Sequence, residues 1–407
     1  MGSEWREMTL GDVLTLQRGH DLPSQKRSSG SVPIVSSSGI SDYHNSAAAS
    51  GPGVVTGRYG TIGEVFYIEG DYWPLNTTLY VKDFKGNHPK FVYYLLKTID
   101  FHQFNDKSSV PGVNRNHAHQ ARVSIPHPDT QRQIAAILSA FDDKIELNRQ
   151  MNRTLEQMAR ALFKSWFVDF DPVRAKMRGE QPEGMDAETA TLFPDEMEEV
   201  DGREVPRGWR VGTVGDIAQQ TKEQIDPSIQ PDARFAHFSI PAFDAENRPT
   251  LERGSAIKSN KFLIPEGAVL VSKLNPATPR IWDTDKVADA DFKVCSTEFI
   301  PLIARQSEFY PLLLTALKDE SFSKSLAEQA SGTSNSHQRV RPADIITAPM
   351  MLPPSDVAVA FGRLTIPILG HMKYNIRESA HLSSIRDTLL PRLLSGEVDV
   401  SGWEGIQ

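Results

Sequence analysis

Apolar residues recur at every seventh position along one stretch of the chain, between Gln131 and Phe167. The repeating positions and their companions three residues on are Ile134, Phe141, Asn148, Leu155 and Leu162, with Ile137, Met151 and Met158. Such a seam is typical of a helix that packs lengthwise against another helix. One run by itself would also fit an ordinary surface helix.

A second stretch near the end of the chain has the same register. Its seam and companion positions are Phe361, Ile368, Asn375, Leu382 and Leu389, with Leu364 and Ile385. Each seam has one asparagine in its middle, Asn148 in the first and Asn375 in the second. A buried asparagine lowers the stability of an apolar seam but fixes its register and its choice of partner. We therefore predict that the two helices pair inside the chain, and that Asn148 and Asn375 meet at one level and lock the coiled-coil register.

The globular part of the chain is duplicated as well. Trp5–Val13 (WREMTLGDV) reappears as Trp209–Ile217 (WRVGTVGDI), and each copy opens a segment that ends in a proline-rich exit before a heptad helix. This period is far too long for a solenoid and indicates a tandem domain duplication. The predicted organisation is a globular domain at 1–130, a helical region at 131–178, an acidic linker at 179–206, a second globular domain at 207–355 and a second helical region at 356–407.

Within each globular segment, short runs rich in β-branched and aromatic residues alternate with turn clusters. We predict strands at Val32–Val35, Gly53–Thr56, Glu64–Ile68, Thr77–Val81, Gly267–Val271 and Thr297–Ile300, and helices at Pro89–Phe104 and Tyr310–Leu326. These elements indicate the α+β class, with two tandem globular domains separated by two long helices.

The composition is that of a soluble globular protein, with 39% hydrophobic and 24% charged residues. No apolar run approaches the ~18 residues of a membrane span, and no signal peptide is visible, so we expect a cytoplasmic protein. A single cysteine, Cys295, excludes an internal disulfide.

The net charge of −8 comes almost entirely from one segment. Residues 179–205 contain ten acidic residues and one basic residue, and the rest of the chain is close to neutral. We interpret the segment as a solvated linker, with a DNA-mimicking role as the alternative. Any DNA contact must then come from local loops or be shared with a partner.

The chain lacks the common catalytic motifs. It has no phosphate-binding G-x-x-x-x-G-K-[ST] loop, no G-x-G-x-x-G dinucleotide fingerprint, and no H-E-x-x-H, G-x-S-x-G or paired metal-ligand spacing. We therefore predict no catalytic residue, no metal site and no cofactor in this chain.

Polar, glycine-rich loops occur at matching places in both globular segments. Arginine and asparagine in such loops are the side chains that read guanine and adenine edges, although any single loop residue could equally be part of a solvated turn. The candidate DNA-binding residues are Lys26, Arg27, Arg58, Tyr59, Thr61, Asn114, Arg115, Asn116, His117, Lys273, Asn275, Arg280, Ser334, Asn335, His337, Gln338 and Arg339. By position, the loop at Lys273 corresponds to the loop at Arg58.

Four motifs give the chain a family resemblance. Leu162–Lys176 (LFKSWFVDFDPVRAK) and Leu389–Glu397 (LLPRLLSGE) resemble the ends of the central and distal helical regions of type I restriction–modification specificity subunits. Gly57–Gly63 (GRYGTIG) and Val271–Pro276 (VSKLNP) are similar to loops of that family's target-recognition domains. The second domain lacks the GRYGTIG form, so its loop matches only by position.

The resemblance implies a non-catalytic subunit with two target-recognition domains and two helices that pair antiparallel. It also implies assembly on double-stranded DNA with two modification (methyltransferase) subunits, which hold adenosylmethionine, and with restriction subunits that use ATP and Mg. For docking these partners we expect Trp166, Phe167 and Phe170 at the end of the central helix.

Together these features predict a DNA-binding protein that reads the two halves of a split site and holds its two reading domains at a fixed distance, as a molecular ruler. At ~1.5 Å per residue the first helix spans roughly 55 Å, enough to hold two domains at grooves about 34 Å apart. A scaffold that joins two protein-binding domains remains an alternative, favoured by the near-neutral charge. A fragment of a DNA methyltransferase is a third alternative, which the missing motifs disfavour.

Overall fold

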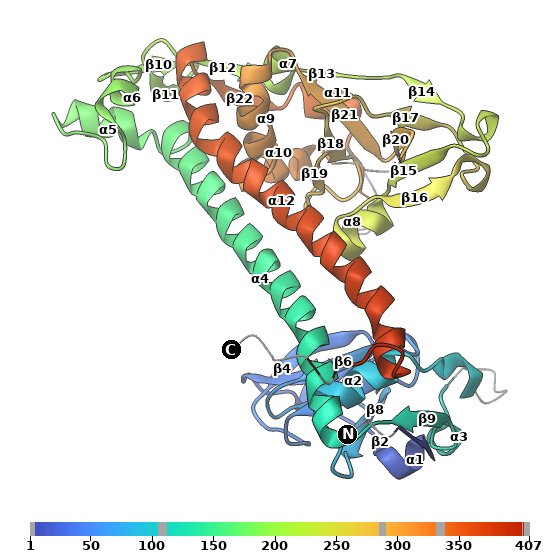
Figure 1. The fold of residues 1–407 in the computed structure, drawn as a ribbon. Helices are drawn as coiled ribbons and strands as arrows, with labels where there is room; N and C mark the ends of the chain where they lie inside the picture. The colour runs from blue at the N-terminus through green and yellow to red at the C-terminus, as the bar shows by residue number, and fades with distance from the viewer. Residues whose placement is uncertain (1–4, 105–111, 285–289, 331–337, 401, 403–407) are drawn as a thin grey trace. The chain divides into compact units, whose positions relative to one another are not determined.

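Two long helices connect the two globular parts of the chain. The computed structural model describes residues 5–104, 112–284, 290–330, 338–400 and 402. Its contacts define two compact units, unit 1 (Met1–Asn148 and Arg377–Gln407) and unit 2 (Arg149–Ile376). The 40-residue helices α4 (Pro128–Phe167) and α12 (Ser355–Leu394) contribute residues to both units (Figure 1). None of the described helices is both long and apolar enough to cross a membrane.

Unit 1 combines small sheets with short helices and the adjoining parts of α4 and α12. Its elements are β1 (Arg6–Thr9), α1 (Leu10–Val13), β2 (Thr15–Arg18), η1 (Ser24–Lys26), β3 (Val32–Ser36), β4 (Gly39–His44), β5 (Gly53–Gly57), β6 (Val65–Ile68), β7 (Trp73–Pro74), β8 (Thr78–Asp83), α2 (Pro89–Lys97), η2 (Phe101–Phe104), α3 (Arg115–Ala118) and β9 (Arg122–Ile125). The four predicted strands of this domain are β3, β5, β6 and β8.

Unit 2 has the same kinds of layers and a larger second sheet. Its elements are α5 (Asp171–Met177), α6 (Ala187–Thr191), β10 (Met197–Val200), β11 (Arg203–Pro206), β12 (Arg210–Thr213), α7 (Val214–Ile217), β13 (Ala218–Gln220), β14 (Gln224–Ile225), η3 (Pro227–Ile229), β15 (Arg234–Phe238), α8 (Ile240–Glu246), β16 (Thr250–Arg253), η4 (Gly254–Ala256), β17 (Lys261–Leu263), β18 (Val269–Ser272), β19 (Ile281–Asp283), β20 (Phe292–Cys295), β21 (Phe299–Ala304), η5 (Ser307–Phe309), α9 (Tyr310–Leu317), α10 (Glu320–Gln329), α11 (Pro342–Ile346) and β22 (Pro349–Leu352).

The strand topology repeats between the units. The central sheet has the order β2-β8-β5-β6 in unit 1 and β13-β21-β18-β19 in unit 2, with every neighbouring pair antiparallel. Each unit also pairs its first strand with its exit strand, β1 with β9 and β12 with β22. The duplication predicted from the two tryptophan-led segments is therefore present in the fold.

The same short cap follows the first strand of each unit. In unit 1 the Thr9 backbone N–H donates to Asp12 Oδ2 at 3.1 Å, and Asp12 returns a bond to the Thr9 hydroxyl at 3.3 Å. In unit 2 the Thr213 backbone N–H donates to Asp216 Oδ2 at 2.8 Å. This reciprocal capping of orphan N–H groups explains why the T-x-G-D sequence occurs in both copies.

The two long helices pair antiparallel, as the resemblance implies. In unit 1, Arg386 bonds Asp142 and Glu378 bonds Asn148, whereas in unit 2 Asn375 bonds Asn152. Residues nearer the C-terminus of α4 therefore contact residues nearer the N-terminus of α12, which is the order of an antiparallel pair.

The expectation that Asn148 and Asn375 meet is wrong. Asn148 Nδ2 donates to Glu378 Oε2 at 2.7 Å and to the Ser379 hydroxyl at 3.3 Å, whereas Asn375 Nδ2 donates to Asn152 Oδ1 at 2.9 Å. Asn152 lies one helical turn beyond Asn148 on α4, so the two seams are offset by a turn. Both predicted asparagines are nonetheless buried, each 1% exposed.

Two of the predicted seam companions lie outside the seam. Met158 is 52% exposed and Leu364 is 48% exposed. The predicted helices of the globular domains are also shorter than expected. The first ends at Lys97, and the second breaks after Leu317 because Asp319 caps a new helix, α10, by accepting a bond from the Ser321 backbone N–H at 2.9 Å.

The aromatic residues predicted to dock partners are instead part of the core of unit 2. Trp166, Phe167 and Phe170 are 3%, 3% and 7% exposed. They pack against Phe193 and Trp209, with ring centroids 4.9 to 5.9 Å apart. The docking prediction is wrong for these three residues because the chain itself covers their rings.

The acidic segment is folded rather than solvated throughout. It contains α6 and the β10–β11 hairpin, and Ala190, Phe193 and Val205 within it are buried. Its connection to unit 2 is apolar, because Phe193 belongs to the main core cluster of that unit. Its acidic side chains lie on the outside of a packed element.

Candidate nucleic-acid interface

The β5–β6 connection of unit 1 forms a tight loop that presents Arg58, Tyr59 and Thr61. A Cβ on Gly57 would lie 1.7 Å from the Thr61 carbonyl oxygen, so only glycine permits this turn. The backbone N–H groups of Arg58 and Tyr59 both donate to the Thr77 carbonyl oxygen, at 2.9 and 3.1 Å. The loop is therefore fixed to the central sheet while its polar side chains remain partly accessible.

The two side chains at the tip of this loop stack on each other. The Arg58 guanidinium carbon lies 4.4 Å from the centroid of the Tyr59 ring. Gly112 lies directly behind that ring, since a Cβ there would be 2.1 Å from the Tyr59 Cε1 atom. Stacking limits the rotamers of Arg58, which lowers the entropy lost when the guanidinium binds a base or a phosphate.

The second predicted loop of unit 1 joins the first through the backbone. The Val113 N–H donates to the Arg58 carbonyl oxygen at 3.1 Å. Asn114 caps α3 by accepting a bond from the Asn116 N–H at 2.9 Å, so its side chain has a structural role. Arg115, Asn116 and His117 follow on the exposed surface of α3.

Unit 2 builds the same arrangement with different side chains. The Lys273 N–H donates to the Glu298 carbonyl oxygen at 2.8 Å, and the Val340 N–H donates to the Lys273 carbonyl oxygen at 3.1 Å. Leu274 pairs with Arg339 as an isolated bridge, and the Asn275 N–H donates to the Gln338 carbonyl oxygen at 2.8 Å. Lys273 therefore makes the same backbone hydrogen bonds in unit 2 as Arg58 makes in unit 1. The sequence alone had paired these two loops only by their position in each domain.

Three of the candidate arginines form ion pairs inside the chain. Arg280 makes a two-point contact with Asp244, at 2.7 and 2.9 Å, and its side chain is only 12% exposed. The prediction that Arg280 reads DNA is wrong for this conformation, because its donors are already used and covered. Arg27 bonds Asp42 at 3.0 Å. Arg339 bonds Glu298 at 3.2 Å but stays 52% exposed, and this hydrogen bond raises its pKa.

The remaining candidates divide into exposed and undescribed residues. Lys26 ends η1 and is exposed, as is Thr61. Ser334, Asn335 and His337 lie outside the described residues.

One further residue beside the Arg58 loop was not predicted. Ser37, in the turn between β3 and β4, lies against Gly60, since a Cβ there would be 3.3 Å from the serine Oγ. No sequence signal placed Ser37 beside this loop.

Neighbouring polar groups have structural roles. His119 Nε2 accepts a hydrogen bond from the Leu16 backbone N–H at 2.9 Å, and burial lowers its pKa. Cys295 is buried, which raises the pKa of its thiol to about 12, so it is not a reactive nucleophile. Among the residues that the structure describes, none form a group of three or more His, Cys, Asp or Glu suited to a metal ion.

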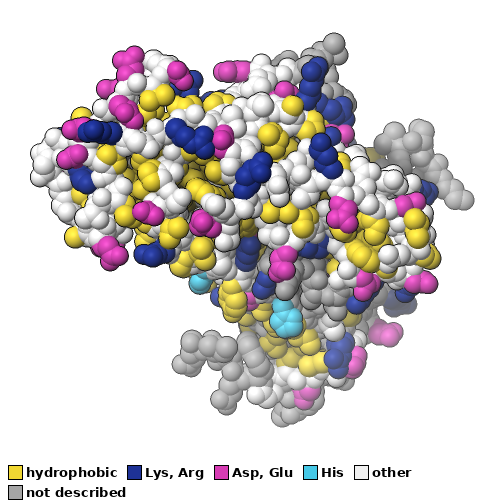
Figure 2. All heavy atoms as spheres, turned by 90° about the horizontal axis from the view of Figure 1, so that it is seen from above, with side chains coloured by type: hydrophobic (Ala, Val, Ile, Leu, Met, Phe, Trp, Pro, Cys, Tyr) yellow, Lys and Arg dark blue, Asp and Glu magenta, His cyan; other side chains and the backbone are white. Residues whose placement is uncertain are grey.

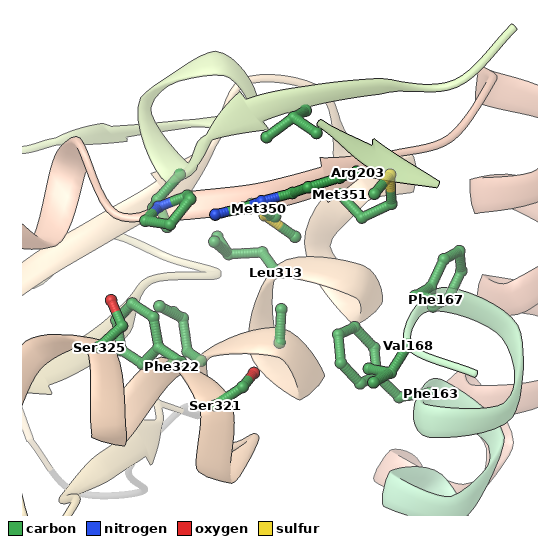
Figure 3. A pocket seen from close by; sticks show the side chains of 15 residues that line it. Phe163, Phe167, Val168, Arg203, Leu313, Ser321, Phe322, Ser325, Met350 and Met351 are labelled. Carbon is green, nitrogen blue, oxygen red and sulfur yellow. The ribbon is translucent and has the colours of Figure 1, made fainter. Parts of the chain in front are cut away.

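A hollow of about 230 Å³ lies in unit 2 beside the end of α4 (Figure 3). Phe163, Phe167, Leu313 and Met350 contribute to its apolar wall, and Arg203 lies along one edge. Arg203 is its one charged residue among the described lining residues. Ser321 and Ser325 also line the hollow, but none of its described lining residues is a carboxylate or histidine that could act as the base for a serine hydroxyl.

Basic side chains do not gather into one patch on the face drawn in Figure 2. There Lys and Arg are interspersed with Asp and Glu, as the near-neutral charge outside the acidic segment predicts. A broad positive field is missing from that face, so any DNA contact made there would depend on local loops.

The sequence is similar to those of known proteins. Residues 2–157 match the family described as the type I restriction modification DNA specificity domain. The chain is 30% identical over 362 residues to the specificity subunit of the type I restriction enzyme HindI of Haemophilus influenzae, covering 76% of this chain and 77% of that subunit. It is 26% identical over 333 residues to the MjaIX specificity subunit of Methanocaldococcus jannaschii, covering 76% and 69%.

The fold is similar to a solved structure. The S subunit of a type I restriction-modification system from M. genitalium superimposes with a TM-score of 0.58, at 15% identity and over 96% of each chain. At this identity the likeness concerns the fold alone.

Proposed function

The chain belongs to the family of type I restriction–modification specificity subunits, and from this premise we propose that its two units each read one half of a split DNA site. Recognition rather than catalysis is the role assigned to this chain. Methyl transfer and cleavage are then the work of partner subunits, which supply adenosylmethionine, ATP and Mg.

The observation that carries this proposal is the repeated loop scaffold. Arg58 and Lys273 have the same backbone bonds to a strand start and to a second loop, yet they differ as side chains. A common frame with different side chains suits two readers of different short sequences, because base-edge contacts are made by side chains. The family relationship does not favour the alternative of a scaffold that joins two protein-binding domains.

The helix pair acts as the spacer in this proposal. At about 1.5 Å per residue, a 40-residue helix is about 60 Å long. Domains attached along such a rod can contact major grooves about one turn, or ~34 Å, apart. The recognised site would consist of two short half-sites with a non-specific gap of roughly six or seven base pairs between them.

The test is to sequence methylated DNA from cells that express this chain with its modification subunits. A split, adenine-methylated motif that disappears when this gene is deleted supports the proposal. A continuous motif, or methylation that is independent of this chain, contradicts it.

The partners require a docking surface other than the buried aromatic residues at the end of α4. We place it on apolar residues that the helix pair exposes in unit 2, namely Met158, Leu364 and Ile366, which are 52%, 48% and 57% exposed. Ile366→Asp should reduce co-purification of the modification subunit. Ile229→Asp is the matched control, because Ile229 is 77% exposed but lies in η3 rather than on α4 or α12. Equal loss in both variants would refute this surface.

A further inference from the structure

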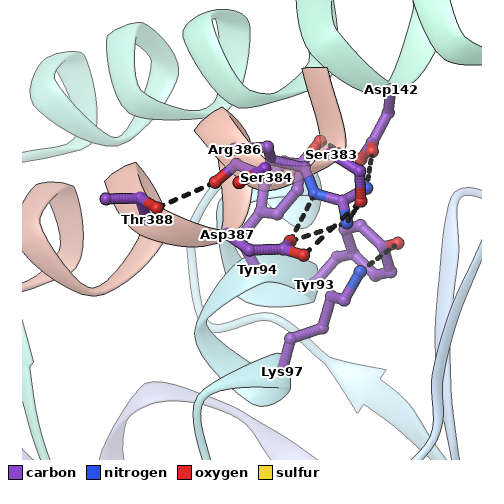
Figure 4. A network of polar contacts seen from close by, with 9 residues as sticks. All are labelled: Tyr93, Tyr94, Lys97, Asp142, Ser383, Ser384, Arg386, Asp387 and Thr388. Carbon is purple, nitrogen blue, oxygen red and sulfur yellow. Dashed lines mark hydrogen bonds and ion pairs between the residues drawn. The ribbon is translucent and has the colours of Figure 1, made fainter. Parts of the chain in front are cut away.

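One carboxylate in unit 1 links the globular part to both long helices. The Tyr94 hydroxyl, on α2, donates to Asp142 Oδ2 at 2.6 Å. On the other side, Arg386 of α12 donates from Nη1 to Asp142 Oδ1 (Figure 4). Tyr94 is 2% exposed, and the side chains of Arg386 and Asp142 are 17% and 27% exposed. Three elements that are distant in sequence are thus joined at one largely buried point.

Unit 2 contains the same chemistry. The Tyr310 hydroxyl, at the start of α9, donates to Asp283 Oδ1. Lys373 Nζ, on α12, lies 2.8 Å from the same oxygen and 3.4 Å from the Tyr310 hydroxyl. The Lys373 and Asp283 side chains are 27% and 16% exposed. Each unit therefore has a tyrosine on its globular helix and a cation on α12 that share one carboxylate. We call these groups the triads: Tyr94, Asp142 and Arg386 in unit 1, and Tyr310, Asp283 and Lys373 in unit 2.

Domain duplication does not account for this correspondence. Asp142 lies on α4, whereas Asp283 ends β19 of the globular sheet. The cations, Arg386 and Lys373, occupy different parts of one helix. The two triads therefore occupy non-equivalent positions in the two copies.

The hydrogen bonds of the triads depend on angle and distance, whereas the surrounding apolar contacts do not depend on direction. In unit 1, Ile134, Leu138 and Leu390 join the globular residues in one core cluster. Such burial is non-directional, so it permits small rotations and slides of a domain on the helices. Hydrogen bonds weaken steeply as their angle and length depart from the optimum, so the triads penalise those motions.

Tyr94 and Arg386, which flank Asp142 in unit 1, both hold their protons more firmly than usual. Burial, together with the hydrogen bond to Asp142, raises the pKa of Tyr94, so its hydroxyl keeps its proton. Burial acts to lower the pKa of Arg386, but the bonds to Asp142 and Asp387 outweigh it and raise that pKa. The donor hydroxyl of Tyr94 and the charge on Arg386 are therefore present near neutral pH.

We propose that Asp142 and Asp283 are positioning residues that fix the orientation of each globular part on the helix pair and thereby restrict the complex to one gap length. This inference rests on the proposed function. The helices alone would set the approximate distance between the two half-sites. Asp142 and Asp283 would restrict the complex to a single gap length.

The experiment uses the complex of this chain with its modification subunits. Tyr94→Phe and Tyr310→Phe each remove one hydroxyl and keep the ring. Tyr93→Phe is the matched control, because the Tyr93 hydroxyl accepts a bond from Lys97 within α2, at 3.2 Å. Initial methylation rates are measured on duplexes with the native half-sites at the native gap and at gaps one base pair shorter and longer.

We expect the ratio of native-gap to shifted-gap rates to fall roughly tenfold in Tyr94→Phe and in Tyr310→Phe, the size of effect typical for a buried hydrogen bond to a charged group. Tyr93→Phe should keep the wild-type ratio. Arg386→Met, which leaves Tyr94 bonded to Asp142, should also lower it and serves as a second variant if a phenylalanine variant does not assemble.

An unchanged ratio in the Tyr94, Tyr310 and Arg386 variants overturns the inference, even if their rates fall at every gap, because a uniform loss reports stability alone. An equal fall in Tyr93→Phe overturns it too. A duplex with scrambled half-sites distinguishes a failure of the proposed function from a failure of the positioning role. If the wild-type complex methylates that duplex as fast as the native one, the proposed function fails rather than the positioning role.

Discussion

Val113 donates its backbone N–H to the carbonyl oxygen of Arg58 at 3.1 Å, so the two candidate reading loops of unit 1 form one surface. Val340 makes the corresponding bond to Lys273 in unit 2, also at 3.1 Å. This bond depends on backbone atoms alone, so the side chains at both positions are free to differ. The arrangement separates the frame that holds a loop from the residues that confer specificity.

Arg58→Ala and Lys273→Ala should therefore affect different half-sites. If each side chain contacts a base edge, each substitution should cost about 1–3 kcal/mol at one position of one half-site and leave the other half-site unchanged. Binding to duplexes with single base changes measures this. Uniform weakening on all sequences would instead identify a phosphate contact, and both variants affecting the same half-site would contradict the assignment of one unit to each half.

Gly57→Ala should disrupt the loop that carries Arg58. The added Cβ would lie 1.7 Å from the Thr61 carbonyl oxygen, so the backbone must shift. We expect a loss of about 1–3 kcal/mol of stability and loss of discrimination at the unit 1 half-site. Gly70→Ala is the control, because a Cβ there meets nothing within 4 Å. Thermal unfolding and half-site binding would be measured together, and wild-type behaviour of Gly57→Ala would show that the turn adapts.

The two buried asparagines should respond differently to leucine. Asn148 Oδ1 is buried without a partner among the described residues, while its Nδ2 donates to Glu378 and Ser379. Asn148→Leu removes the unsatisfied acceptor, and Glu378 keeps its ion pair with Lys144 at 3.2 Å, so the melting temperature should rise. Asn375→Leu leaves the Asn152 carbonyl oxygen without its donor and should lose about 1 kcal/mol. The two substitutions are therefore expected to shift the melting temperature in opposite directions. Melting temperatures that shift in the same direction would contradict it.

Glu156 should make stability dependent on acid pH. Burial alone would raise the pKa of its carboxyl group, but Lys318 and Arg160 outweigh burial and hold that pKa below its usual value. A carboxyl whose pKa is lower in the folded state stabilises the fold above its unfolded pKa of about 4.3, and that stabilisation is lost as the pH falls through the folded pKa.

Glu156→Gln should therefore lower the melting temperature at pH 7, and its deficit relative to wild type should shrink below about pH 4. Glu320→Gln is the control, since its ion pair with Lys324 is largely exposed and such pairs contribute little. A deficit that stays constant from pH 7 to pH 3 would show that Glu156 acts by packing rather than by charge.

Periodicity and internal repeats were enough to predict the architecture. The seven-residue spacing from Ile134 to Leu162 and from Phe361 to Leu389 identified both long helices, because only a lengthwise helix contact needs that period. The repeated T-x-G-D sequence located the start of each domain through a local cap. These signals are contained within a few turns of chain.

Contacts between distant segments could not be predicted in the same way. Trp166 looks like an exposed anchor until Phe193 and Trp209 are placed around it, and Arg280 looks available until Asp244 is placed beside it. Arg386 carried a weak signal, since it follows the companion position Ile385, where charged residues join paired helices, but Asp142 follows Phe141 at a position without that role. Nothing in the sequence indicated that Tyr94 shares the same carboxylate.

Lengthening the helix pair tests the account most directly. Seven residues are inserted in both helices at one level, between Asn152 and Leu155 in α4 and between Met372 and Asn375 in α12, which a bond between Asn152 and Met372 places side by side. The insertion adds about 10.5 Å, or up to about three base pairs at 3.4 Å each. Sequencing of methylated DNA should then give the same two half-sites with a longer gap. The same half-sites at the original gap would contradict the claim that the helix pair sets the spacing.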